Sequence, residues 1–357
     1  MQLVAYGAQD IYLSGNPQIT FFKVVYRRHT NFAVESIEQT HNGSVASKSK
    51  ISVTVSRNGD LLSQVWLALK DSASGTDDYT SATAWAAIDN VEVEIGGQVI
   101  DKQYGDWMRI WTDLTHDKAK TESLGNCLKA DLGLGEESFI PLQFWFCRNP
   151  GLALPLIALQ YHEVKLNITF GTLQGTGAVT VWCDYVFLDT DERRRFAQVS
   201  HEYLIEQVQY SNALSVTGGS DAQHELRFNH PVKELVWTIT GAALGTSKNA
   251  LLQLNGHDRF KRRSGKYFTT VQRYQHHSGV DDTVNADTHK CVPHVYSFAL
   301  KPEEHQPSGT CNFSRIDNAV LNLETVSGSG AKTLKVYAVN YNVLRIMSGM
   351  GGLAYSN

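Results

Sequence analysis

The sequence is short of several features that mark particular classes of protein. Its 357 residues include five cysteines, an odd number without a CxxC pair, so neither a disulfide framework nor a zinc knuckle is expected. Acidic and basic residues nearly balance, 36 against 32, and the formal net charge is only −4. Such a charge creates no strong field toward nucleic acid. We therefore expect buried free thiols and no direct nucleic-acid partner.

Long apolar runs are also missing. The N-terminus has no basic region followed by an apolar core, and the most apolar stretch, residues 152–159, is too short to cross a bilayer. We therefore expect a soluble product made in the cytosol. The length suffices for two or three domains, each with a core of its own.

Catalytic and metal-binding motifs do not occur in this sequence. It contains no GxSxG, P-loop or dinucleotide fingerprint. Metal-binding jelly rolls of the cupin class use an HxH pair, whereas His276 and His277 are adjacent and would point to opposite sides of a strand. We expect both histidines to be exposed to solvent or to lie in a hairpin. Glu303-Glu304 and Asp281-Asp282 lie in loop-like sequence and do not converge on one bond. We expect no enzyme, no metal and no cofactor.

What the chain does contain is a near repeat. Residues 93–107, VEIGGQVIDKQYGDW, and residues 252–268, LQLNGHDRFKRRSGKYF, each begin with an alternating strand and end with a glycine and an aromatic residue. The turns between, Gly96-Gly97 and Asn255-Gly256, supply the positive φ angles of tight hairpins. The repeat indicates two related units.

Further echoes support a duplicated domain. Val181-Trp182 matches Val336-Tyr337, and Val65-Trp66-Leu67 resembles Val236-Trp237-Thr238, at offsets of about 155 to 170 residues. Period-2 patterns recur in both halves, which favours a β-sandwich of jelly-roll type in each. One helix is predicted over residues 104–114, with an apolar face that we expect to seal one end of the first sandwich.

A charged segment marks the join between the halves. We place the boundary near Ser200, so that residues 1–199 hold the first unit and 200–357 the second. Arg193, Arg194 and Arg195 follow three acidic residues, which favours a solvated interdomain turn or a subunit ion-pair cluster over a phosphate site. Residues 261–263, Lys-Arg-Arg, are a better anion-binding candidate, although a polar loop edge is favoured there too. The glycine-rich segments 327–330 and 348–352 are predicted to be a hairpin loop and a surface tail.

Five segments also resemble the major capsid proteins of nucleocytoplasmic large DNA viruses. They are specific, occur in the family's order and span the chain, at residues 7–33, 188–198, 228–237, 309–323 and 341–357. The resemblance implies two consecutive eight-stranded jelly rolls with short helices in loops, and a homotrimer shaped as a pseudo-hexagon. It further implies an icosahedral shell over an internal membrane, with neighbouring trimers and minor capsid and penton proteins as partners. The protein would be part of the virion capsid, assembled in the host cytoplasm.

The non-periodic ends hold our candidates for assembly contacts. The aromatic candidates are Tyr6, Tyr12, Phe21, Phe22 and Tyr355, each of which could instead pack on its own sandwich. The basic candidates are Arg27, Arg28, Arg193, Arg194 and Arg195. We predict that removing residues 7–20 or 348–357 leaves folded sandwiches with impaired assembly.

One alternative is a glycan-binding protein of two jelly rolls, because tryptophan and tyrosine on sandwich faces can stack on sugars. Trp66, Trp85, Trp182 and Trp237 lie mostly in apolar strand runs, however, where packing in the core is favoured. A cupin-like enzyme ranks third. The connections in this chain are short where the family often carries long insertions, so a role tied to such insertions is in doubt.

Overall fold

The computed structural model describes residues 7–70, 79–130, 136–174, 177–217, 219, 221–240, 247–279, 292–325 and 331–355. These residues belong to two compact units, one ending at Asn31 and the other running from Phe32 to Asn357. The first unit contains a single described turn of helix, α1 (Ile11–Ser14), and is otherwise extended. It is too short to bury a core, and its described side chains are exposed.

The first sandwich consists of two antiparallel sheets. Sheet 1A has the strand order β1-β10-β4-β7, with β8 also paired to β4. Sheet 1B has the order β2-β3-β9-β5-β6. The strands span Phe32–Gln39 (β1), His41–Asn42 (β2), Lys50–Thr54 (β3), Leu61–Lys70 (β4), Ile88–Ile95 (β5), Gln98–Tyr104 (β6), Glu137–Pro141 (β7), Leu154–Pro155 (β8), Val164–Phe170 (β9) and Ala178–Leu188 (β10).

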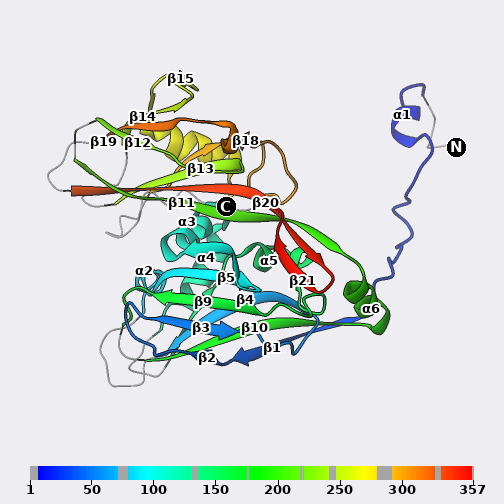
Figure 1. Ribbon diagram of the computed structural model, residues 1–357. Helices are drawn as coiled ribbons and strands as arrows, with labels where there is room; N and C mark the ends of the chain where they lie inside the picture. Colours follow the sequence, from blue (N-terminus) through cyan, green and yellow to red (C-terminus); the bar gives the residue numbers. More distant parts are fainter. Residues whose placement is uncertain are drawn as a thin grey trace. The chain divides into compact units, whose positions relative to one another are not determined.

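The second sandwich, drawn above the first in Figure 1, repeats the central strand order of both sheets, although β2 of the first sandwich and β21 of the second have no counterpart among the described strands. Sheet 2A runs β11-β20-β13-β17, with β18 on β13 and β21 on β20, and sheet 2B runs β12-β19-β14-β15, with β16 on β14. The strands span His201–Thr217 (β11), Asp221–Glu225 (β12), Pro231–Thr240 (β13), Ser247–Leu254 (β14), His257–Asp258 (β15), Arg263–Ser264 (β16), His294–Ser297 (β17), Cys311–Asn312 (β18), Ala319–Thr325 (β19), Ala331–Met347 (β20) and Met350–Leu353 (β21). The predicted pair of consecutive jelly rolls is confirmed.

The repeated hairpins occupy corresponding places. The β5–β6 turn has positive φ at Gly96 and Gly97, and the β14–β15 turn has it at Asn255 and Gly256, as the sequence predicts. One of the predicted echoes is wrong by one residue. Trp66 points out of its sheet, whereas Trp237 points into the second core, so Val236 is the counterpart of Trp66.

Each sandwich has its own apolar core, but the cores do not divide cleanly at the junction. The first core includes Ile205, Leu344 and Ile346, which come from the long strands β11 and β20 of the second half. The tail was predicted to run along a surface without strand structure, which is wrong. Its residues form β21, and Gly351 lies so close to Leu159 of the first core that a Cβ would come within 2.6 Å. Removing residues 348–357 therefore also removes contacts of the first sandwich.

Short helices fill the connections. They are α2 (Ser81–Ala86), α3 (Gly105–Thr115), α4 (Lys118–Leu128), α5 (Trp145–Arg148), α6 (Thr190–Gln198) and α7 (Gln272–His276), with a π turn η3 (Tyr267–Val271) before α7 and 3-10 turns η2 (Pro150–Leu152) and η4 (Phe313–Arg315). The predicted helix over 104–114 is confirmed as α3, and its Met108 enters the first core, but most of its apolar side chains do not face the first sandwich as expected. Its Trp107 and Trp111 pack against sheet 2A, and α3 lies between the two jelly rolls (Figure 1).

The charged junction forms the helix α6 instead of the solvated turn that we expected, so this prediction is wrong. Asp189 caps the helix by accepting a hydrogen bond from the Thr190 N–H (2.8 Å), and Asp191 and Glu192 occupy the first turn, where acidic side chains favour a helix. The predicted hairpin at 327–330 lies outside the described residues. Whether the domain boundary belongs near Ser200 stays a prediction; β11 begins at His201.

Candidate assembly interface

A third apolar core joins the two jelly rolls. Trp107, Ile110, Trp111 and Leu114 of α3 are buried against sheet 2A. The ring of Trp107 lies 5.3 Å from the ring of Tyr337 on β20, measured between centroids. Aromatic pairs of this kind add about 0.5 to 1.5 kcal/mol beyond the area they bury. The helix thus fixes one sandwich on the other by the same physics that stabilises a core.

Buried charges surround this core. The Lys233 side chain is fully buried, and its Nζ lies 2.8 Å from Glu206 Oε1. Arg148 Nη1 donates to the other oxygen of Glu206 at 3.0 Å, and its guanidinium stacks 3.9 Å from the centroid of the Trp111 ring. Removing one partner of a buried ion pair is costly because the other charge stays unpaired. The layer therefore favours one arrangement of the two sandwiches.

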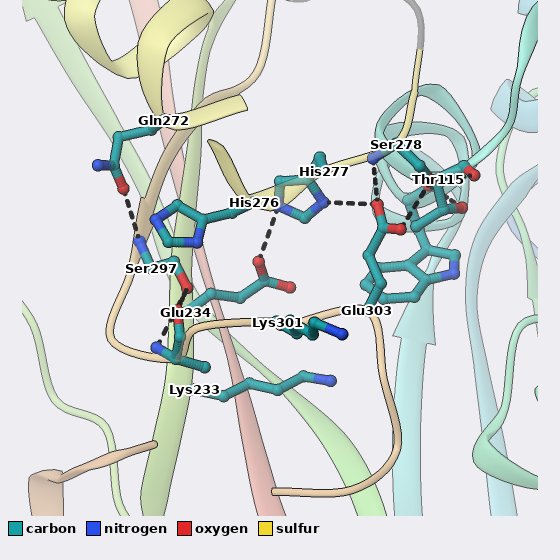
Figure 2. Close-up of polar contacts among 12 residues, drawn as sticks. Thr115, Lys233, Glu234, Gln272, His276, His277, Ser278, Ser297, Lys301 and Glu303 are labelled. Carbon is teal, nitrogen blue, oxygen red and sulfur yellow. Dashed lines mark hydrogen bonds and ion pairs between the residues drawn. The ribbon is translucent and has the colours of Figure 1, made fainter. Parts of the chain in front are cut away.

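His277 extends the same layer. Its Nε2 lies 3.1 Å from Glu234 Oε2 and its Nδ1 lies 3.0 Å from Glu303 Oε1, as Figure 2 shows. Glu303 also accepts from both the backbone N–H and the hydroxyl of Ser278, and the oxygen of this hydroxyl lies 3.0 Å from the carbonyl oxygen of Thr115 at the end of α3. The prediction of an exposed histidine is wrong here, because the His277 side chain is fully buried.

The charge state of His277 follows from its neighbours. Burial by itself would lower the pKa of His277, but the carboxylates of Glu234 and Glu303 outweigh it and raise the pKa to about 9. Burial likewise opposes ionisation of Glu234, yet His277 and Lys233 hold its pKa below the usual value. His277 is thus an imidazolium that donates from both ring nitrogens at neutral pH.

Further polar contacts tie the first jelly roll to the second. The Val208 N–H donates to Asp101 Oδ1 at 3.1 Å, and the Gly279 N–H donates to the carbonyl of Leu114 at 2.7 Å. Asp106 of α3 forms an ion pair with Lys335 of β20. Burial raises the pKa of Asp101 to about 6 against the hydrogen bonds that favour its charged form. The contact between the two jelly rolls therefore combines an apolar core with buried ion pairs, although some of its buried polar atoms, such as Arg148 Nε and Glu234 Oε1, have no hydrogen-bond partner among the described residues.

The predicted assembly residues are spread over several surfaces. In the first unit Tyr12, Phe21 and Phe22 are 91%, 89% and 98% exposed, and Arg27 and Arg28 are exposed as well. Tyr6 lies outside the described residues. Tyr355 follows β21 and is 62% exposed, while its carbonyl accepts a hydrogen bond from Asn342 (2.9 Å). The structure contains a single chain and therefore does not test contacts between subunits. The assembly role of these residues remains a prediction.

The junction arginines divide into two kinds. Arg193 Nη2 lies 2.9 Å from Asp60 Oδ2, and Asp60 also accepts from the Leu188 N–H, so Arg193 ties α6 to the first sandwich. Arg194 and Arg195 are exposed. In the run at 261–263, Arg262 pairs with Asp221 (3.2 Å) and lies 3.9 Å from Glu324, which fits the polar loop edge better than an anion site.

The tryptophans are not all in the cores. Trp85 and Trp237 are 4% and 1% exposed, as expected. Trp66 and Trp182 are half-buried and pair across neighbouring strands on the outer face of sheet 1A. For these two the prediction of core packing is wrong, because each lies on the strand face opposite to the core residues Val65, Leu67, Val181 and Cys183.

The sequence reading missed Arg148, Glu206 and Lys233. One signal was available: Lys233 and Glu234 interrupt an otherwise apolar strand run, PVKELVW, in which every charged residue is fully buried. Within the described ranges, no group of three or more His, Cys, Asp or Glu side chains is arranged to hold a metal ion. None of the helices in those ranges is long and apolar enough to span a membrane. The described cysteines are free thiols, and Cys291 lies outside the described residues.

Comparisons with known proteins agree with this architecture. Residues 20–189 match the family model "Major capsid protein N-terminus", and residues 192–352 match "Large eukaryotic DNA virus major capsid protein". The chain is 55% identical to the major capsid protein of Pyramimonas orientalis virus and 44% identical to that of Paramecium bursaria Chlorella virus 1. Each alignment covers 100% of this chain and 99% of the relative.

Among solved structures, the quasi-atomic model of the PBCV-1 virus capsid matches with a TM-score of 0.82 at 40% identity, over 95% of this chain and 100% of that one. The faustovirus major capsid protein has the same fold, with a TM-score of 0.74 at 10% identity, over 96% of this chain and 94% of that one. None of these findings supports the glycan-binding alternative. The chain belongs to the family of major capsid proteins of large eukaryotic DNA viruses.

Proposed function

We propose that this chain builds the shell of a large DNA virus as a homotrimer that imitates a hexagon. The observation that carries the proposal is the shared central strand order of its two jelly rolls, which are held together by the buried α3 contact. Three chains that close head to tail bring six similar blocks around a threefold axis. Blocks of nearly hexagonal outline tile a flat facet, so one gene product can cover a large surface.

The proposed partners are other copies of the chain, in the trimer and in neighbouring trimers. Further proposed partners are minor capsid proteins, penton proteins and the surface of the internal viral membrane. Assembly takes place in the host cytoplasm. The role is structural, without catalysis. A permanent trimer interface is expected to bury more than about 2,000 Å². Contacts between trimers can each be weaker, because many of them act together in the shell.

The short connections bear on the outer surface of the tile. The alignments to the two relatives extend over 401 and 439 positions, against 357 residues in this chain, so the relatives carry segments that it lacks. We propose that the tile is low, and that a recognition role which depends on long insertions is absent from it.

Light scattering on purified protein tests the trimer directly. The expected mass is three times the 39.7 kDa of one chain. A stable monomer at micromolar concentration would overturn the proposal. Electron microscopy of concentrated protein then tests the tiling, with hexagonal arrays of three-subunit units as the expected result.

The N-terminal unit has a separate test. A variant that lacks residues 7–20 keeps both sandwiches, because their cores contain none of those residues. We expect normal unfolding of this variant together with weakened array formation. Arrays that form at the same protein concentration as those of the full chain would rule out the bracing role of Tyr12 and its neighbours.

A further inference from the structure

The helical segment formed by η3 and α7 follows the β14–β15 hairpin of the second jelly roll and corresponds to α3 in the first. Helix α3 begins at Gly105, and Gly265 lies two residues before η3; each glycine lies against the first residue of a strand. A Cβ on Gly105 would come within 2.2 Å of the Ile88 carbonyl oxygen, and one on Gly265 within 1.8 Å of that of Ser247. Three residues later, Met108 enters the first core and Phe268 enters the second. Gly105 and Gly265 are therefore equivalent positions, from which the two helical segments can be compared.

The face of α3 that contacts sheet 2A has a counterpart in the second helix. Trp107, Trp111 and Leu114 are 0%, 5% and 0% exposed. The same spacing from Gly265 leads to Tyr267, Val271 and Tyr274. The π turn puts an extra residue into this helix. Tyr267 packs against the second core, and Gln272 and Arg273 are buried. Val271 is 40% exposed and Tyr274 is 88% exposed, so these two side chains point away from the core of the jelly roll that carries them.

The receiving face is duplicated as well. In sheet 2A a row of side chains crosses four strands beneath α3, from Tyr210 through Tyr337 and Val236 to Val295. The corresponding row of sheet 1A runs from Glu38 through Trp182 and Trp66 to Pro141. We call these residues of sheet 1A the Trp66–Trp182 row.

The Trp66–Trp182 row is not buried. Both tryptophans are half-buried, and Phe139 and Val34 on the same outer face are 37% and 58% exposed. A groove of about 490 Å³ borders the row at Trp66 and Pro141. A solvent-facing pair of tryptophans beside a groove suits an aromatic or aliphatic side chain from another surface.

We propose that Val271 and Tyr274 of one subunit pack on the Trp66–Trp182 row of a second copy of this chain. The contact between α3 and sheet 2A inside the chain is then repeated between chains. This inference rests on the proposed trimer and names its surfaces. Each subunit donates one helix edge and receives one, so the contact is head to tail and closes as a ring when three chains bring six jelly rolls.

The polar rim of the intrachain contact provides a sharper test of register. Asp106, one residue after Gly105, pairs with Lys335, which lies two residues before Tyr337 on β20. The equivalent positions are Lys266 in the donated helix and Thr180 in the receiving sheet. These two residues belong to the same chain but are expected to meet only across the subunit boundary.

The first experiment compares Tyr274→Glu with Tyr161→Glu. Tyr161 is 76% exposed on the first jelly roll, so the control places the same charge on a tyrosine outside the proposed contact. Light scattering over a concentration series is expected to show that Tyr274→Glu raises the trimer dissociation midpoint at least about tenfold, since a buried aromatic anchor is lost. The control should shift it by less than about threefold. Equal midpoints for the two variants count against the inference.

The second experiment joins Thr180→Cys to Lys266→Cys in one chain with a short thiol-specific crosslinker. Covalent dimers and trimers on a denaturing gel are expected from the double variant in clear excess over those from either single variant or the parent, in which only the native free thiols can react. If the N-terminal unit of a neighbour covered the row instead, Thr180→Cys would crosslink to Phe22→Cys and not to Lys266→Cys, which would overturn the inference.

The two proposals fail in different ways. A wild-type protein that stays monomeric would contradict the proposed function. A wild-type trimer that neither responds to Tyr274→Glu nor crosslinks through Thr180 and Lys266 leaves the proposed function standing and overturns this interface alone.

Discussion

Sheets 1A and 2A have the same strand order, yet their outer faces have different fates. Every residue of β13 between its two ends is buried, because α3 and the charged layer cover sheet 2A. The equivalent strand β4 leaves Gln64 exposed and Trp66 half-buried. The comparison teaches that one copy of the face has become an interface within the chain, while the other copy is left partly exposed.

The chemistry of the two faces matches their burial. Gln64 occupies the position of sheet 1A that Glu234 occupies in sheet 2A, because Trp66 and Val236 are equivalent and each follows two residues later. Glu234 can be buried because His277 neutralises it, whereas Gln64 needs no partner at the surface. The same backbone thus accepts a permanent ion pair on one copy and a neutral polar residue on the other.

The largest expected difference between the faces comes from truncating their aromatic anchors. Trp107→Ala removes a fully buried ring from the contact on sheet 2A and should lower the free energy of unfolding by about 3 to 5 kcal/mol. Trp66→Ala should cost about 1 kcal/mol in the dissociated subunit, since its side chain is already partly hydrated. Urea unfolding, at protein concentrations below the midpoint of trimer dissociation, measures the free energy of unfolding of both variants. Equal losses would mean that the two faces are equally covered.

A smaller effect should appear as pH dependence of the buried face alone. The pKa of His277 is raised from 6.5 to about 9, so its contribution to stability is fully present below pH 6.5 and is lost as the pH rises through 9. Between pH 6.5 and 9.5 the loss amounts to about 3 kcal/mol. The pKa values of Glu234 and Glu303 are lowered, so the stability that these carboxylates contribute is lost only on acidification, below the range of pH 6.5 to 9.5.

The measurement for this prediction is the free energy of unfolding of the wild type and of His277→Gln across that pH range. The difference between the two should shrink toward high pH. Gln64→Ala, at the equivalent position of the exposed face, should leave the pH dependence of the wild type unchanged. A His277→Gln variant with the same pH profile as the wild type would contradict a charged His277.

The smallest expected effect concerns the rim of the interface. Lys335→Gln removes the ion pair with Asp106, which is partly exposed, and should cost about 0.5 to 1 kcal/mol of unfolding free energy at low salt. Thr180→Ala, its counterpart on sheet 1A, should stay within about 0.5 kcal/mol in the dissociated subunit. Added salt should narrow the gap between the two variants, and a gap that persists in 1 M salt would argue against an electrostatic origin.

Much of the fold could be predicted from local patterns. The two hairpins follow from glycine and asparagine at positions of positive φ, and α3 follows from apolar residues at helical spacing. The face of a strand is less secure, because a slip of one residue exchanges inside and outside. This is why the echo between Trp66 and Trp237 misled, and why Trp66 and Trp182 were expected in the core.

The interface residues could be predicted less well than the fold. Glu206, Lys233 and Arg148 are far apart in the sequence, and each by itself is typical of a surface residue. His277 is one of two adjacent histidines, and nothing near it in the sequence indicates that Glu234 and Glu303 will lie on either side of its ring. Burial of a charge depends on partners that only the packing of two domains brings together.

The sequence by itself determined the duplication, the jelly-roll class and the family, because turn chemistry, strand period and family-like segments are local properties of the chain. Only the tertiary structure decided which of the two equivalent sheet faces is covered, since this depends on where α3 of one copy lies on the other. A long-range contact between a helix and a sheet leaves no period in the sequence. It is nevertheless this contact that buries the outer face of sheet 2A and leaves the equivalent face of sheet 1A partly exposed.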